Sequence, residues 1–276
     1  MTAGGTSARR PKTADVAIWL VLAAGAAVVI FPIYWIFANA VDANASIDEL
    51  WPRSWDFSSF VDAWRTQPFG QWYLNSTLIA VIAVAITVSI NLLAGYTFAK
   101  YRFRGRTIIF FAILITLMVP IQVILVPEFL LVVNLHLLGS VWSVILPRAA
   151  EPFGIFMARQ FFLSIPDEVI EAARVDGAGD FRIFLYVVLP LARPLIAVLT
   201  IFTFMYRWND FSWPLVVLQN VNSFTVTLGL NSMYGVLHVP ETQVMAMSLV
   251  SIVPMMIVFI LFQRYFVAGI ATTGAK

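Results

Sequence analysis

Long runs of apolar residues, separated by short polar stretches, dominate the pattern of this chain. Asp, Glu, Lys and Arg are absent from residues 16–41, 66–99, 107–127 and 242–263, and they are rare in residues 140–163 and 191–218. A helix needs about 20 predominantly apolar residues to cross a bilayer. The pattern therefore predicts six transmembrane helices, at about residues 16–41, 72–98, 107–127, 140–163, 191–218 and 242–266.

An all-α, polytopic membrane protein follows from this pattern, and the composition agrees. Hydrophobic residues make up 61% of the chain, charged residues only 12%, and the mean hydropathy is +0.87. Because a soluble domain carries about 25% charged residues, a soluble enzyme, a disordered chain and a nucleic-acid-binding protein with a basic surface are excluded. The absence of cysteine also excludes a disulfide scaffold and a thiolate metal site. Without a Gly/Ser linker or an internal repeat, residues 1–276 are expected to form a single membrane domain.

The first apolar run could also be part of a secretion signal. Arg9, Arg10 and Lys12 precede it, and its end at Ala38-Asn39-Ala40 resembles a signal-peptide cleavage site. The apolar region of a signal peptide spans about 7–15 residues, however, and this run is longer. We therefore expect a retained signal-anchor helix.

Basic residues predict the orientation, because cytoplasmic loops carry an excess of Lys and Arg. If six spans alternate, one side receives Arg9, Arg10, Lys12, Lys100, Arg102, Arg104, Arg106, Arg174, Arg182, Arg193 and Lys276. The opposite side receives mainly Arg53 and Arg65. Both termini are thus predicted to be cytoplasmic. The first outward loop is acidic, with Asp42, Asp48, Glu49, Asp56 and Asp62, and interfacial in character, with Trp51, Trp55, Trp64 and Trp72.

Residues 164–190 form the longest and most charged cytoplasmic loop. Pro166 followed by Asp167 is typical of a helix start, since proline is tolerated in the first turn and an acid interacts favourably with the helix dipole. Gly177 and Gly179 would end this helix by adopting turn conformations that other residues resist. A second helix is expected from about Asp180 towards Leu189.

This loop also contains a recognisable sequence motif. Glu171-Ala172-Ala173, three residues, Gly177, nine residues and Val187-Val188-Leu189-Pro190 resemble the signature E-A-A-x3-G-x9-I-x-L-P of ABC importer permeases, with Val187 in place of isoleucine. In that family the loop is the coupling helix, which docks in a groove on the cytoplasmic ATPase subunit. The resemblance implies that role for Glu171, Ala172, Ala173, Asp176 and Gly177.

Two further stretches resemble one branch of these permeases. Residues 208–215, W-N-D-F-S-W-P-L, and the C-terminal stretch 263–270 are similar to those of the maltose-type (MalG-like) carbohydrate-import permeases. The resemblance implies a non-catalytic subunit of a prokaryotic inner-membrane importer that translocates a carbohydrate. An extracytoplasmic solute-binding protein would deliver the solute and contact residues 219–241, in which His238 is expected to be an ordinary loop histidine. The resemblance also implies a second, different permease chain and ATPase partners that bind the ATP and magnesium, so no cofactor is expected in this chain.

Ionisable residues inside predicted spans mark candidate functional sites, because they are costly in a bilayer. Arg148 and Glu151 lie three apart in the fourth span, and Arg207 and Asp210 lie three apart in the fifth. At about 1.5 Å per residue, both pairs would lie at similar depth in the outer half of the membrane. They could line a solute cavity, close as pairs within one helix, or brace neighbouring helices.

Asn209 and Trp213 are four apart, so they would share a helix face beside the second pair. An amide that bonds hydroxyl groups and an indole that stacks on a sugar ring would suit a carbohydrate. Trp213 could instead anchor the helix at the membrane interface. In the third span, Pro120 and Pro127 predict kinks suited to a moving gate or to static packing, with Glu128 just beyond.

The same sequence argues against several other functions. No Walker A loop, H-E-x-x-H or G-x-S-x-G motif is present, so a bound nucleotide or a familiar hydrolase centre is not expected. A secondary transporter would often show inverted repeats. An intramembrane enzyme would need a pair of catalytic acids. A permease for a glycerophosphate-type solute is the nearest alternative to a sugar permease.

Overall fold

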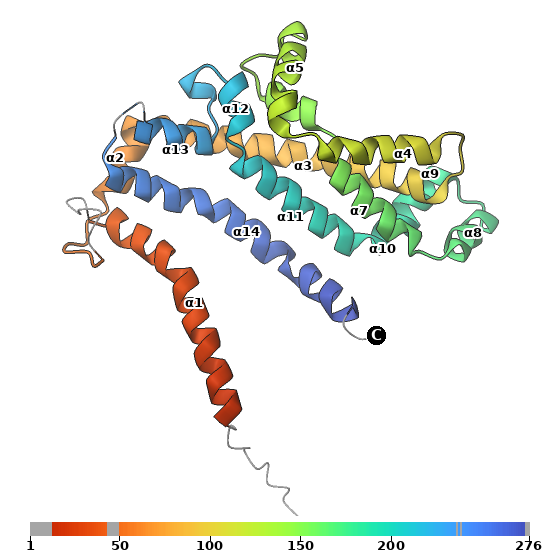
Figure 1. The fold of residues 1–276 in the computed structure, drawn as a ribbon, viewed down its shortest axis with the longest axis horizontal. Coiled ribbons are helices and arrows are strands. Elements are labelled where there is room, and N and C mark those ends of the chain that lie inside the picture. The colour runs from red at the N-terminus through yellow and green to blue at the C-terminus, as the bar shows by residue number, and fades with distance from the viewer. Residues whose placement is uncertain (1–12, 43–49, 236, 238, 274–276) are drawn as a thin grey trace, which may run out of the picture. The chain divides into compact units, whose positions relative to one another are not determined.

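The computed structural model describes residues 13–42, 50–235, 237 and 239–273 (Figure 1). Every regular element in this part of the chain is a helix, so the all-α fold class is confirmed. Several residues used above for orientation or function lie outside the described residues, namely Arg9, Arg10, Lys12, Asp48, Glu49, His238 and Lys276.

The described helices fall into two compact units. Met1–Arg65 and Val239–Val250 make up the first, and Thr66–His238 and Ser251–Lys276 make up the second. The first unit holds α1 (Thr13–Ala40), most of α2 (Ser58–Thr66) and the start of α14 (Glu241–Thr273). The buried Asp42, just after α1, accepts hydrogen bonds from the Arg53 backbone N–H at 2.7 Å and the Ser54 hydroxyl at 2.9 Å.

The second unit contains the remaining elements in chain order. These are α3 (Phe69–Lys100), α4 (Arg106–Ile115), η1 (Thr116–Met118), α5 (Ile121–Asn134), α6 (Val141–Ile145), η2 (Leu146–Arg148), α7 (Pro152–Leu163), α8 (Asp167–Val175), α9 (Asp180–Ile183), the π-helix η3 (Phe184–Val188), α10 (Leu189–Leu191), α11 (Arg193–Asn209), α12 (Ser212–Val217), η4 (Val221–Ser223) and α13 (Val226–Gly235), followed by the rest of α14.

Three helices are long and apolar enough to cross a membrane unbroken: Asp15–Ala40, Phe69–Lys100 and Glu241–Arg264. Two further candidates are pairs of helices bent at a short break. Arg106–Met118 and Ile121–Asn134 meet at 108°, and Asp180–Leu191 and Arg193–Asn209 meet at 80°. The predicted span 140–163 is divided among α6, η2 and α7. The structure therefore interrupts the predicted spans 107–127, 140–163 and 191–218, the first of them at Pro120 as expected.

The breaks have local causes. Pro120 and Pro152 each precede or begin a new helix, and Pro147 lies within the single turn of η2. A proline has no N–H to donate and its ring displaces the carbonyl one turn earlier, so it favours a break, although α5 continues through Pro127. At the end of α11 the backbone of Asp210 is extended, with φ −66° and ψ 121°. These interruptions leave polar backbone and charged side chains inside otherwise apolar segments.

The helix α3 is the centre of the second unit, packed along α7 and α11 (Figure 1). Its contact with α7 uses small residues at matching intervals. A Cβ atom added to Gly95 would overlap Ala158, and one added to Gly154 would overlap the Asn91 side chain. Each helix thus presents two contact residues four positions apart. This close packing resembles the small-residue interfaces typical of membrane helices.

One tryptophan lies elsewhere than expected. Trp51, Trp55 and Trp64 are exposed, in keeping with an interfacial loop, but Trp72 is fully buried. Its indole N–H donates to the Val221 carbonyl at 2.6 Å. Trp72 therefore helps to fix the segment between α12 and α13 and does not anchor the chain at the membrane surface.

Candidate functional site

The coupling loop predicted over residues 164–190 begins with a short helix, α8, whose C-terminus is closed by a complete cap. Gly177 has φ +82°, its N–H donates to the Arg174 carbonyl at 3.0 Å, and the Ala178 N–H donates to the Ala173 carbonyl at 3.0 Å. These two hydrogen bonds around a left-handed residue are those of a Schellman motif. The glycine therefore ends the helix as the sequence predicted, and it does so with its backbone in a conformation that a side chain would strain.

The two faces of α8 differ in exposure. Ile170 is buried and Ala173 packs against the same apolar cluster, which also holds Phe162 and Phe184. Glu171, Ala172, Asp176 and Gly177 are exposed. The structure adds Val175 to this outer face, 88% exposed. A firmly packed inner face with a charged and apolar outer face suits a docking element.

Ion pairs hold the loop at both ends of α8. The Lys100 ammonium, at the end of α3, lies 2.6 Å from Asp167 Oδ1 and also donates to the Ile165 carbonyl at 2.5 Å. The hydrogen bond and charge of Lys100 hold the pKa of Asp167 below its ordinary value of 3.8. At the other end of α8, the Arg174 guanidinium lies 3.0 Å from Oδ1 of Asp180, which follows the cap. The loop is thereby fixed to the end of α3 and across its own turn.

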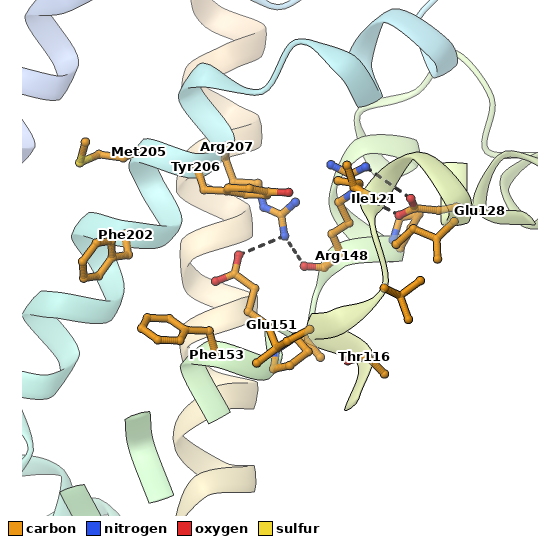
Figure 2. A pocket seen from close by; sticks show the side chains of 16 residues that line it. Thr116, Ile121, Glu128, Arg148, Glu151, Phe153, Phe202, Met205, Tyr206 and Arg207 are labelled. Carbon is orange, nitrogen blue, oxygen red and sulfur yellow. Dashed lines mark hydrogen bonds and ion pairs between the residues drawn. The ribbon is translucent and has the colours of Figure 1, made fainter. Parts of the chain in front are cut away.

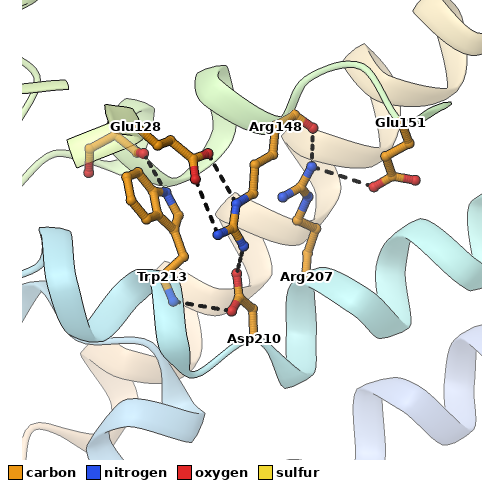
Figure 3. Close-up of polar contacts among 7 residues, drawn as sticks. Glu128, Arg148, Glu151, Arg207, Asp210 and Trp213 are labelled. Carbon is orange, nitrogen blue, oxygen red and sulfur yellow. Dashed lines mark hydrogen bonds and ion pairs between the residues drawn. The ribbon is translucent and has the colours of Figure 1, made fainter. Parts of the chain in front are cut away.

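The intramembrane charges form a second site, in which Arg148 joins two carboxylates from different segments (Figure 3). Arg148 Nε lies 3.2 Å from Glu128 Oε1 on α5, and Arg148 Nη1 lies 2.9 Å from Asp210 Oδ2, just after α11. The side chains of Glu128, Arg148 and Asp210 are 11%, 9% and 9% exposed. The guanidinium also lies 5.0 Å from the ring centroid of Trp213. This buried cation connects α5, η2 and the break after α11.

Arg207 makes the second link. Its Nη2 lies 3.5 Å from Glu151 Oε1 and also donates to the Arg148 carbonyl. Glu151 is further held by the Thr203 hydroxyl, which donates to Oε2 at 3.1 Å, and its backbone N–H donates to Asn91 Oδ1 at 3.2 Å. Side chains from α3 and α11 thus bind the Arg148 carbonyl and both the N–H and the carboxylate of Glu151, at the break before α7.

The ion pairs are not the ones that a three-residue spacing within one helix would suggest. Arg148 does not pair with Glu151, and Arg207 does not pair with Asp210; instead, the partners are exchanged across two elements. Pairs within one helix fail because neither helix is continuous there: η2 ends at Arg148 and α11 ends at Asn209. The charges brace neighbouring elements, and all of them except Asp210 also line a cavity.

That cavity has a volume of about 730 Å³ and lies against η1, α5, the break before α7, and α11 (Figure 2). Its charged wall consists of Glu128, Arg148, Glu151 and Arg207, and its aromatic wall of Phe153, Phe202 and Tyr206. The Arg207 side chain is fully buried, whereas Glu151 is 25% exposed. The carboxylate of Glu151 is thus the most accessible charge in the network.

Asn209 and Trp213 do not share the helix face that their spacing predicts. Trp213 is fully buried, and its indole N–H donates to the Ser143 carbonyl at 2.9 Å. Asn209 is exposed, and its amide donates to the Met205 carbonyl at 2.9 Å. The helix break at Asp210 separates the two residues, so the four-residue spacing no longer places them on one face. Neither lines the cavity.

Sequence reasoning gave no role in the network to three residues that complete it: Asn91, Glu128 and Thr203. Glu128 was visible as an acid beside Pro127 in an apolar segment, but its pairing depends on the 108° bend before α5. Asn91 and Thr203 are polar residues of ordinary appearance in long helices. Their contacts with Glu151 become visible only in the fold, where α3 and α11 lie against the break before α7.

Comparison with known proteins places these features in a family. Residues 91–272 match the family described as "Binding-protein-dependent transport system inner membrane component". This stretch contains the coupling loop and all five residues of the charged network.

The relatives with assigned roles agree with this match. The arabinooligosaccharides transport system permease protein AraQ of Bacillus subtilis (strain 168) is 36% identical over 206 residues, which cover 75% of this chain and 73% of that protein. The sn-glycerol-3-phosphate transport system permease protein UgpE of Yersinia pestis is 33% identical over 270 residues, covering 93% and 95%.

A solved structure extends the likeness to the fold. A chain of a bacterial ABC transporter involved in the import of the acidic polysaccharide alginate superimposes with a TM-score of 0.82 at 28% identity, covering 93% of this chain and 99% of that one. The chain therefore belongs to the family of binding-protein-dependent transport system inner membrane components, and is a multi-pass permease subunit of an ABC importer in the inner membrane.

Proposed function

We propose that this permease translocates a neutral carbohydrate. The observation that carries the proposal is the charge balance of the network beside the cavity. The network has three carboxylates and two guanidinium groups, and both guanidinium groups are nearly buried while Glu151 reaches the cavity. Aromatic side chains beside an accessible carboxylate suit the apolar faces and hydroxyl groups of a sugar. A phosphate or carboxylate on the solute would meet the wrong charge.

The size of this repulsion supports a neutral solute over the glycerophosphate alternative. Two like charges about 6 Å apart repel by about 3 kcal/mol at an effective dielectric constant of about 20. AraQ is named for arabinooligosaccharides and UgpE for sn-glycerol 3-phosphate. The accessible Glu151 favours the first kind of solute for this chain. A secondary transporter is disfavoured by the coupling loop, which would have no purpose without an ATPase.

The rest of the proposed assembly follows from the coupling loop and the family. ATP-binding cassette subunits would dock on α8 through Glu171, Ala172, Ala173, Asp176 and Gly177, and would hold the ATP and magnesium. This chain would then be a non-catalytic subunit. An extracytoplasmic solute-binding protein would deliver the sugar, and a second permease chain would complete the pathway. Residues 1–276 would form one membrane domain with six spans and both termini in the cytoplasm.

Movement of the pathway would use the broken helices. Arg148, Glu151, Arg207 and Asp210 join the break before α7 to the break after α11. Asn209 and Trp213, which lie outside the cavity here, would reach the solute only if these segments rearrange. Interrupted helices that meet at a polar site are suited to alternating access.

Uptake into vesicles containing the assembled transporter tests the solute class. The vesicles are given a neutral oligosaccharide or its uronic-acid counterpart, each at a concentration that saturates the binding protein. We expect the neutral sugar to be transported at least about tenfold faster by the wild type, and Glu151→Gln to reduce that ratio about tenfold. Glu241→Gln removes a carboxylate outside the cavity and should leave the ratio unchanged. Equal ratios for all three proteins would exclude Glu151 from solute selection.

A further inference from the structure

The segment between α3 and α4 carries positive charge that is not balanced by acids. Lys100 pairs with Asp167, whereas Arg102, Arg104 and Arg106 form no ion pair within the described part of the chain. Arg102 lies near enough to Asp167 to favour its ionised form, but that carboxylate already accepts the hydrogen bond of Lys100. The first turn of α4 contains no acidic residue either. This edge of the second unit is therefore a concentrated positive surface.

Two of these arginines face a common hollow. A cavity of about 470 Å³ is lined by Arg102, Phe103, Gly105, Arg106, Thr107 and Ile108. The left-handed turn at Gly105, with φ +83°, brings the chain back so that residues on both sides of it line the cavity. Arg106 uses Nη1 to donate to the Tyr101 carbonyl at 3.0 Å, which orients its guanidinium.

A third cation lies behind them. The Arg159 guanidinium on α7 lies 4.4 Å from the ring centroid of Phe110, on α4, and its Nε donates to the Phe98 carbonyl at 3.3 Å. Arg106 and Arg159 are near enough to repel each other, and neither has a carboxylate partner among the described residues. Exposed arginines in a loop are what membrane topology alone would require. A half-buried, uncompensated arginine behind the loop is more than topology requires.

An apolar strip leads away from the cavity along α4. Ile108, Phe111 and Ile115 are 75%, 59% and 60% exposed, and their spacing of three and four residues places them on one helix face. The cavity thus joins a cluster of guanidinium groups to an exposed apolar track, at the point where one candidate membrane helix ends and the next begins.

We propose that this cavity binds the headgroup of an anionic phospholipid, with the phosphate between Arg102 and Arg106 and an acyl chain along Ile108, Phe111 and Ile115. Guanidinium groups bind phosphate oxygens through paired N–H donors. Basic pockets beside membrane helices bind such headgroups. A free phosphate would bind the arginines but would not contact the apolar strip. Because the arginines and the apolar strip adjoin, we infer that the ligand is a lipid. The site does not depend on the identity of the transported solute.

Native mass spectrometry of the detergent-purified full chain tests the proposal. The chain is titrated with dioleoyl phosphatidylglycerol or dioleoyl phosphatidylcholine, which carry the same acyl chains and differ in net charge. We expect phosphatidylglycerol to bind the wild type at least about tenfold more tightly, and the variant Arg102→Gln with Arg106→Gln to lose most of that preference. Inorganic phosphate at millimolar concentration should not displace the lipid.

The matched control is the variant Arg104→Gln with Arg182→Gln. It removes the same charge from loops on the same predicted side, but neither residue lines the cavity. It should keep the preference to within about threefold. Equal loss in both variants would mean a diffuse attraction and would overturn the site, as would equal binding of the two lipids. Displacement by inorganic phosphate would show a free-anion site instead.

Discussion

Arg148 Nη1 lies 2.9 Å from Asp210 Oδ2, and this contact joins the break before α7 to the break after α11. Both side chains are about nine-tenths buried, and Arg148 also pairs with Glu128. A buried ion pair contributes little when it is replaced as a whole, because desolvation of the charges offsets their attraction. Removal of one partner is different, since it leaves an uncompensated charge.

Arg148→Gln should therefore lower the free energy of unfolding by about 3–5 kcal/mol. The variant leaves the carboxylates of Glu128 and Asp210 buried without a cation. Chemical unfolding of the full chain in detergent micelles measures the change. The double variant Arg148→Gln with Asp210→Asn should recover part of the loss, because one of the two stranded charges is then gone.

Arg182→Gln is the control for this experiment, since Arg182 is exposed and belongs to α9. Its effect should stay within about 0.5 kcal/mol. A loss in Arg148→Gln no larger than in Arg182→Gln would show that the network contributes nothing to stability.

The cap of α8 predicts a difference between two neighbouring glycines. Gly177 has φ +82°, whereas Gly179 has an ordinary backbone conformation and open space where a Cβ would lie. Gly177→Ala should strain the end of the coupling helix by about 1–2 kcal/mol and reduce the solute transported per ATP hydrolysed severalfold. Gly179→Ala should leave it near the wild-type value.

The ratio is measured in vesicles containing the assembled transporter, with ATP hydrolysis and uptake followed together. Glu171→Lys, which reverses an exposed charge on the outer face of α8, should lower the ratio in the same way. Wild-type coupling in both Gly177→Ala and Glu171→Lys would refute the role of this helix.

The packing of α3 on α7 predicts a third pair of outcomes. A Cβ at position 95 would overlap Ala158 and lie 2.8 Å from the Arg159 backbone nitrogen. Gly95→Ala should therefore destabilise the chain by about 1–3 kcal/mol through overpacking. Gly25, in α1, has open space at the same point, so Gly25→Ala should raise the stability by about 0.5–1 kcal/mol through its better helix propensity. The same unfolding assay measures both, and a neutral Gly95→Ala would contradict the close contact.

The sequence was informative where one local signal decides the structure. Gly177 is an example: a glycine after a helix that begins with Pro166 and Asp167 predicts a cap, and the cap is present. The long apolar runs likewise predicted helices at α1, α3 and α14. These features depend on residues that follow one another in the chain, which a single sequence displays.

The charged site could be located from the sequence but its pairing could not. Arg148, Glu151, Arg207 and Asp210 were recognised because charges in apolar segments are rare. Their partners stayed open, because three-residue spacing indicates a pair within one helix only where the helix is continuous. Pro147, Pro152 and the extended backbone at Asp210 interrupt both helices. Glu128 enters the site through a bend of 108°. Bends and contacts between distant helices depend on packing, which local patterns do not contain.

The last prediction concerns pH. Lys100 lowers the pKa of Asp167, chiefly through its hydrogen bond to the carboxylate. A carboxyl group whose pKa is depressed in the folded state stabilises that state fully above its unfolded pKa, and this contribution is lost as the pH falls through the folded value. Both values lie at or below about 3.8, so the pair should hold α8 equally from pH 5 to pH 8. Hydrogen exchange of the α8 amides, corrected for the intrinsic rate, should then give a protection factor independent of pH in this range.

Asp167→Asn should lower that protection factor a few-fold at every pH, because the ion pair of Lys100 and Asp167 is exposed and contributes modestly. Glu168→Gln removes a neighbouring acid from the same helix turn without breaking an ion pair, and should change protection less. An equal loss in the two variants would assign the effect to the helix dipole and not to Lys100.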